Sequence, residues 1–147
     1  MEETFHYLLM ANQAAFHREV FQRLKGSGLT SGQPKILDYL GNHDGASQKE
    51  IAKGCHIEPA SLTTVLHGME EKGFIQRRSL HGDRRTSHIF MTDKGRGLQQ
   101  QVAEAFALME ERAFAGIPED ERQNFLKTFA KLYDNVMAQK EEGRAER

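Results

Sequence analysis

The first part of the chain carries apolar residues at intervals of three and four positions. This spacing puts them on one face of an α-helix, which repeats about every 3.6 residues. The series ends before the glycine-rich stretch 26–28, which favours a break. Its members are Phe5, Leu8, Leu9, Ala15, Phe16, Val20 and Leu24. We therefore expect a long amphipathic helix over residues 4–25.

A second helix is predicted to start where Thr30 and Gln33 form a capping box, with Pro34 inside the first turn. The apolar stripe of this helix consists of Ile36, Leu37 and Leu40. Glycines at 41 and 45 mark its end. It is expected to be short and to bury one side.

Two further short helices follow. Ser47 with Glu50 forms another capping box, and this third helix stops by Gly54. Pro59 suits the first position of a fourth helix. The inward positions of the fourth helix are Leu62, Val65, Leu66 and Met69. Small and polar residues then occupy its opposite, outward face.

The pattern changes after Gly73. Residues 74–78 and 86–91 are rich in β-branched and aromatic residues and flank a turn around 81–83, which predicts a β-hairpin.

Two long helices are predicted in the remainder of the chain. Thr92 is a good N-cap for the first, whose stripe comprises Leu98, Val102, Ala105 and Met109, with Phe106 beside them. Gly116 breaks this helix, and Pro118 with three acidic residues starts the last one. Its apolar positions are Phe125, Leu126, Phe129, Leu132 and Val136. We expect the charged segment from Lys140 onward to fray.

Composition narrows the class of protein. The 147 residues are 38% hydrophobic and 28% charged, which indicates one folded, soluble unit with helical extensions. No stretch is apolar enough to span a membrane, and the acidic N-terminus does not resemble a signal peptide, so we expect a cytoplasmic protein without a membrane partner. Cys55 is the single cysteine, which excludes an internal disulfide and a CxxC zinc site.

Enzymatic signatures are missing from the sequence. It contains no nucleophile elbow, phosphate-binding loop, dinucleotide fingerprint or metal-ligand pair at helical spacing. We therefore expect no catalysis, no cofactor and no metal, although a site built from the seven scattered histidines stays open.

The charge is unevenly distributed along the chain. The net charge is −1, but residues 72–96 hold seven basic and two acidic side chains. Positive charge concentrated on one segment is typical of a surface that binds a polyanion such as nucleic acid.

Three short helices followed by a hairpin make a winged helix-turn-helix, in which the fourth helix of this chain enters a DNA major groove. Such a helix needs a compact polar face that hydrogen-bonds base edges and contacts thymine methyl groups. The candidate residues are Ala60, Ser61, Thr63, Thr64 and His67. An ordinary solvated helix face is the alternative.

The hairpin supports the DNA-binding interpretation. Arg77 and Arg78 on its first strand and Arg84 and Arg85 near its turn cluster guanidinium groups, which attract phosphates and fit a narrow minor groove. Asp83 lies two residues before Arg85 and can orient its guanidinium. A pair that only stabilises the turn is the alternative for these two residues.

Three motifs together resemble the MarR family. Residues 83–95 are similar to its wing signature of Asp, any residue, Arg, five residues, a large apolar residue, Thr, any residue and Lys-Gly. Met91 stands where leucine is usual. Leu-Thr-Ser-Gly-Gln at 29–33 resembles the family's Leu-Thr-x-x-Gln, and Met-Glu-Glu-Lys-Gly-Phe-Ile at 69–75 resembles its Leu-Glu-x-x-Gly-Leu-Ile.

The resemblance implies a bacterial transcriptional regulator, usually a repressor, that binds a pseudo-palindromic operator as a homodimer. It makes Arg85 the wing arginine and Asp83 its partner. Thr64 stands where the family often has Arg, and His67 where it often has Asp. Base preferences of other members therefore do not carry over.

The terminal helices independently predict the homodimer. Their apolar stripes are wider than a winged-helix core of about 65 residues can cover, and surplus apolar area of this kind marks an interface. The expected dimerisation residues are Phe5, Leu8, Leu9, Phe125, Phe129, Leu132 and Val136. A two-fold axis would place two recognition helices about 34 Å apart, one DNA turn. A monomer whose terminal helices pack together is the alternative.

The resemblance also implies release by an effector, because family members respond to small aromatic or phenolic acids, to oxidants or to metals. A small aromatic or phenolic molecule is the expected class here, with oxidants and metals as the alternatives. Met10, Phe16 and His17 are candidates for its pocket, with ordinary packing as the alternative. Cys55 is expected to be a buried packing residue, because apolar surroundings raise a thiol pKa.

The fold class is thus mostly α with a small β-hairpin wing (α+β), a winged helix-turn-helix with long N- and C-terminal dimerisation helices. We expect an N-terminal dimerisation helix at 1–28, a DNA-binding lobe at 29–95, C-terminal dimerisation helices at 96–140 and a frayed tail at 141–147. A winged-helix protein-interaction module or a non-specific DNA binder is the alternative function.

Overall fold

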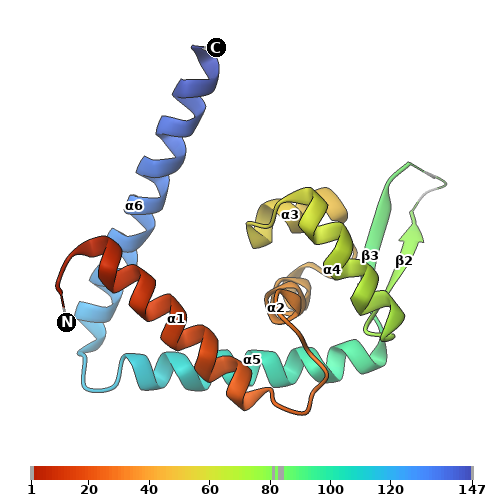
Figure 1. The fold of residues 1–147 in the computed structure, drawn as a ribbon, viewed down its shortest axis with the longest axis horizontal. Coiled ribbons are helices and arrows are strands. Elements are labelled where there is room, and N and C mark those ends of the chain that lie inside the picture. Colours follow the sequence, from red (N-terminus) through yellow and green to blue (C-terminus); the bar gives the residue numbers. More distant parts are fainter. Residues whose placement is uncertain (1, 81, 83–84, 147) are drawn as a thin grey trace. The chain divides into compact units, whose positions relative to one another are not determined.

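The computed structural model describes residues 2–80, 82 and 85–146 (Figure 1). Within them the chain forms six helices and three strands. In chain order these are α1 (Phe5–Arg23), α2 (Gln33–His43), β1 (Ala46–Ser47), α3 (Gln48–Cys55), α4 (Pro59–Glu71), β2 (Ile75–Ser79), β3 (Ser87–Met91), α5 (Asp93–Ala113) and α6 (Glu119–Ala145). The chain divides into two units, residues 1–109 and 110–147. The functional division expected from the sequence remains a prediction.

The core of the first unit lies between α2, α3, α4, α5 and the sheet. Its fully buried large side chains are Ile36, Leu37, Leu40, Ile51, Leu62, Leu66, Met69, Ile89 and Val102. The predicted inward faces of these helices are therefore confirmed, with Val65 half-buried against the same core. This packing holds α4 by one side and leaves its opposite side in solvent.

Two predicted helix starts have different outcomes. Ser47 caps α3, and its hydroxyl accepts a bond of 3.2 Å from the Glu50 N–H, as the sequence predicts. Thr30 does not cap α2, because Gly32 is the N-cap and takes a left-handed φ of 85° that favours glycine. The Gln33 side chain still accepts from the Thr30 N–H at 3.0 Å.

The predicted hairpin is confirmed, and a third strand joins it. Strand β3 lies between β1 and β2 in an antiparallel sheet, with Ile75 opposite Met91 and Ser79 opposite Ser87. The two-residue strand β1 pairs Ala46 with Ile89. Such a strand is too short to show alternation, so the sequence does not reveal it.

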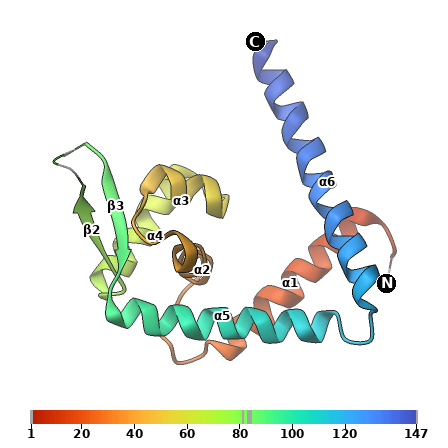
Figure 2. The same cartoon turned by 180° about the vertical axis from the view of Figure 1, so that it is seen from behind.

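The predicted stripe of α5 is buried in the first unit, whereas the stripe of α1 is buried only toward the end of that helix. Val20 and Leu24 are buried, and Phe16 stacks on Phe106 with ring centroids 5.9 Å apart. In both views α1 and α5 cross one another (Figure 2). The buried side chains of α5 are Leu98, Val102, Ala105 and Met109, as predicted.

The second unit consists of the end of α5 and the whole of α6. Phe114 meets Phe125 edge-on at 6.2 Å, and Phe125 stacks on Phe129 at 5.3 Å. Helix α6 continues to Ala145, so the helix extends past Lys140, where fraying is expected. Of the helices in the described part of the chain, none is long and apolar enough to cross a membrane.

Candidate nucleic-acid interface

The outward face of α4 is exposed and polar. Ala60, Ser61, Thr63, Thr64 and His67 all lie in solvent on the side opposite the buried stripe. Pro59 starts the helix as predicted, and the side chain of the N-cap Glu58 makes no capping bond. The N–H groups of the first turn are therefore open to an anion such as a phosphate. Contact of the five residues with DNA remains a prediction.

The wing carries the predicted arginines, but their surroundings differ. Arg78 lies with its guanidinium 4.8 Å from the centre of the Phe90 ring and is exposed. Arg85 is exposed near the turn. Asp83 and Arg84 lie outside the described residues. The orienting pair of Asp83 and Arg85 thus remains a prediction.

Arg77 faces the chain's own helices. Its Nη1 donates to Gln48 Oε1 of α3 at 2.9 Å, and its Nε lies 3.3 Å from Glu70 Oε2 of α4. Gln48 Nε2 in turn donates to Thr63 Oγ1 at 2.8 Å. Two residues predicted to touch DNA, Arg77 and Thr63, are therefore linked to each other through Gln48, a residue that sequence reasoning missed.

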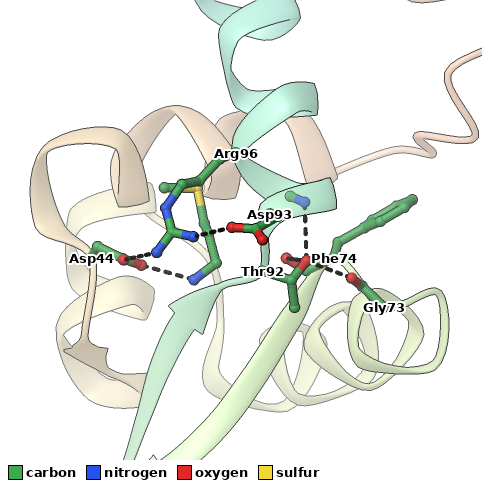
Figure 3. Close-up of polar contacts among 8 residues, drawn as sticks. Asp44, Gly73, Phe74, Thr92, Asp93 and Arg96 are labelled. Atoms are coloured by element: carbon green, nitrogen blue, oxygen red, sulfur yellow. Dashed lines mark hydrogen bonds and ion pairs between the residues drawn. The ribbon is translucent and has the colours of Figure 1, made fainter.

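The base of the wing is held against the end of α4 by Thr92. Its hydroxyl donates to Gly73 O at 2.6 Å and accepts from the Gly95 N–H at 3.0 Å, which confirms it as the N-cap of α5 (Figure 3). Its own N–H donates to Phe74 O at 3.1 Å. A Cβ added to Gly95 would overlap that carbonyl oxygen. The Thr-x-Lys-Gly motif at 92–95 thus has a structural role, since it seats the start of β2 on α5.

Asp44 fixes the other side of the same junction. One carboxylate oxygen accepts from the Met91 N–H at 2.8 Å, and the other lies 3.8 Å from Arg96 Nη2 (Figure 3). Arg96 also reaches Asp93 at 3.1 Å. The end of α2, the end of β3 and the first turn of α5 are therefore tied together.

The lysines of the basic segment also contact the chain itself. Lys94 Nζ donates to Lys72 O at 3.2 Å, and Lys72 Nζ donates to Gly28 O at 2.7 Å. Both ammonium groups lie within 6 Å of the Phe74 ring, at 5.2 and 5.8 Å. His67, in contrast, lies on the open face of α4, with its Nε2 3.2 Å from the exposed Glu71 carboxylate.

The remaining candidates lie away from α4 and the wing. Met10 is exposed, Phe16 stacks on Phe106, and His17 lies 4.6 Å from the Phe21 ring. A pocket role for the three stays a prediction. Among the residues that the structure describes, no group of three or more His, Cys, Asp or Glu side chains could hold a metal ion.

Cys55 is a buried packing residue, as expected. Its Sγ donates to Lys35 O at 3.7 Å, and burial raises the thiol pKa to about 11 despite the nearby Lys35 charge.

The expected dimerisation residues are largely open in the single chain. Leu8 is half-buried, and the others are exposed, with Phe5 at 57%, Phe125 at 52% and Val136 at 68% of their full surface. The exposed members also include Leu9, Phe129 and Leu132. Their burial by a second chain is a prediction.

Comparison with known proteins agrees with this geometry. The model of the MarR family matches residues 29–87. The HTH-type transcriptional regulator YwhA of Bacillus subtilis is 33% identical over 97 residues, which are 66% of this chain and 70% of that protein. The S. aureus MepR–DNA complex has a TM-score of 0.83 at 26% identity and covers 92% of this chain and 99% of its own. The transcriptional repressor CouR, bound to a 23-mer DNA duplex, gives 0.78 at 26% identity over 89% and 93%.

Proposed function

This chain belongs to the MarR family of transcriptional regulators, and on that premise we propose that it is a repressor that binds a pseudo-palindromic operator as a homodimer. A small aromatic or phenolic effector then releases it from double-stranded DNA. The protein acts by binding and performs no catalysis.

The observation that carries the DNA-binding part is the exposed polar face of α4 beside the wing. A buried stripe of Leu62, Leu66 and Met69 holds the helix, so its opposite face is presented as a rigid surface. A helix with such a face fits the width of a major groove, where hydroxyl and imidazole groups can bond base edges. The similar MepR and CouR chains are both described in complex with DNA, which supports the same use here.

The homodimer is supported by the terminal helices. None of the described residues of the 27-residue helix α6 is buried in the single chain. Helices in proteins draw most of their stability from burying an apolar face. Phe125, Leu132 and Val136 offer such a face to a second copy. A two-fold axis through these helices would repeat α4 and the wing on an inverted-repeat site.

The proposals of repression and of release by an effector are supported by the family to which the chain belongs. CouR, at 26% identity, is named a transcriptional repressor, which favours the same sense for this protein. The candidate effector residues Met10, Phe16 and His17 lie on α1, which belongs to the same unit as α4. A ligand held there would act on the unit that carries the DNA-binding face.

The first test is selection of duplexes from a random DNA pool at about 0.15 M salt, where phosphate attraction does not mask sequence preference. We expect an inverted repeat with half-sites one helical turn apart. Recovery of no motif, with weak and steeply salt-dependent retention, would contradict the proposal and favour a non-specific binder or a protein-interaction module.

A further inference from the structure

The contacts of Gln48 join the wing to the DNA-facing side of α4. Gln48 is the first residue of α3, and its amide lies between Arg77 of β2 and Thr63 of α4. The carbonyl accepts from Arg77, and the NH₂ group donates to Thr63. Glu70 holds the other edge of the same guanidinium at 3.3 Å. One half-buried amide thus connects the two elements that face DNA.

The direction of each hydrogen bond follows from the chemistry of the groups. Arginine has no acceptor, so the Gln48 carbonyl oxygen must face Arg77 and the NH₂ group must face Thr63. The Thr63 hydroxyl therefore accepts, and its single proton goes to Pro59 O at 3.1 Å. Thr63 keeps one lone pair and its methyl group for a DNA base.

Resting on the proposed DNA-binding function, we propose that Gln48 is a positioning residue for operator recognition. It locks the wing strand to α4 through Arg77, and it presents Thr63 to the major groove as a hydrogen-bond acceptor. The amino groups of adenine and cytosine are the donors that such an acceptor selects. Arg77, in this arrangement, acts inside the protein and does not neutralise a phosphate.

The decisive experiment is a double-mutant cycle that changes no charge. Q48M keeps the length of the side chain and removes both hydrogen bonds. R77K keeps the positive charge and removes the planar fork that reaches Gln48 and Glu70 together. Affinity for the selected duplex and for a scrambled duplex is measured for the wild type, both single variants and the double variant.

We expect Q48M and R77K each to weaken binding to the selected duplex about tenfold, and the double variant to lose no more than about tenfold, because both changes break one chain of contacts. Two independent contacts would give about a hundredfold loss in the double variant. Binding to the scrambled duplex should change less than about twofold, because no phosphate contact is removed. The preference for adenine or cytosine at one position of each half-site should fall in Q48M.

R23K is the matched control. It makes the same exchange as R77K at the exposed last residue of α1, to which no contact with DNA is assigned. It should leave the affinity for both duplexes within about twofold of the wild type. Melting curves establish that each variant is folded, and R77K tests the same chain of contacts if Q48M does not fold.

Two results would overturn the inference while leaving the proposed function intact: affinity of Q48M within about twofold of the wild type, or losses that multiply in the double variant. Failure of the wild type to select any motif would overturn the proposed function, and this inference with it, before any variant is measured.

Discussion

Replacement of Gly95 by alanine should destabilise the protein, whereas the same change two residues later should stabilise it. Alanine is favoured over glycine in a helix by about 1 kcal/mol, and both positions gain this amount. At Gly97 nothing lies within 4 Å of the added Cβ. At Gly95 the Cβ overlaps the Phe74 carbonyl oxygen and lies 3.0 Å from its carbon. Both sites lie on α5, but the added methyl group meets backbone at Gly95 and open space at Gly97.

The cost at Gly95 follows from the backbone that must move. Phe74 O accepts from the Thr92 N–H at 3.1 Å, and the Thr92 hydroxyl, whose proton goes to Gly73 O at 2.6 Å, lies 3.2 Å from the same oxygen. Overpacking against a fixed neighbour costs about 1–3 kcal/mol, and the loss of one hydrogen bond adds about 1 kcal/mol. After the helix gain, Gly95→Ala should be about 2 kcal/mol less stable than the wild type and about 3 kcal/mol less stable than Gly97→Ala.

Thermal unfolding followed by circular dichroism measures this difference. For a chain of this size 3 kcal/mol corresponds to about 6–12 °C between the two variants. Protein concentration must be equal in all samples, because the melting temperature of an oligomer depends on it. Equal melting temperatures for Gly95→Ala and Gly97→Ala would refute the close approach of α5 to β2 as a requirement of the fold.

Four further outcomes are expected. Arg85→Ala should weaken operator binding about tenfold or more without dissociating the dimer, and unchanged affinity in a gel-shift titration would remove this arginine from the interface. Leu132→Glu should dissociate the dimer or unfold the chain, because it buries a charge in the expected interface, and light scattering measures the resulting molar mass. The control Lys131→Glu, on the same helix, should stay dimeric. A folded dimer of the Leu132 variant would exclude this position from the interface. The Cys55 thiol, with its pKa raised to about 11 by burial, should resist alkylation at pH 8 until urea unfolds the chain. The same shift should lower stability as pH rises from about 9 to 11, because the unfolded thiol ionises first, and Cys55→Ala should lack this dependence.

Most helices of this fold could be predicted from the sequence, because each has a start signal and a stripe that the core needs. Pro59 and Thr92 begin their helices where local chemistry requires it. The prediction that Thr30 caps α2 was wrong, because the capping-box pattern does not show that Gly32, close to Val65, takes a left-handed conformation and becomes the N-cap. Strand β1 exists only because β3 offers it a partner 43 residues away in sequence, and no local pattern carries that information.

The sequence predicts which residues of the candidate site face outward better than it predicts which side chains contact one another. The spacing of buried positions in α4 dictates which residues face outward, so Ser61 and Thr64 are exposed as expected. Gln48 carries no such signal. It is a polar residue at the first position of a short helix, and its role arises only when the fold brings β2 beside the start of α3. Its separation from Arg77 is 29 residues.

Some of the positive side chains of residues 72–96 contact the chain itself and others are exposed on the wing. The structure, and not the sequence, distinguishes these two groups. Lys94 binds the Lys72 carbonyl at the end of α4, and Lys72 binds the Gly28 carbonyl before α2. Both ammonium groups lie over the Phe74 ring, and Arg96 pairs with Asp44 and Asp93. Each of these cations stabilises the junction between α4, the wing and α5. Counting basic residues in the sequence therefore overstates the number of phosphates that the wing can neutralise. The same junction fixes the wing relative to α4, because a hairpin held at its base by Thr92 keeps its arginines at a constant distance from that helix. Recognition of a specific DNA sequence depends more on this constant distance than on additional positive charge.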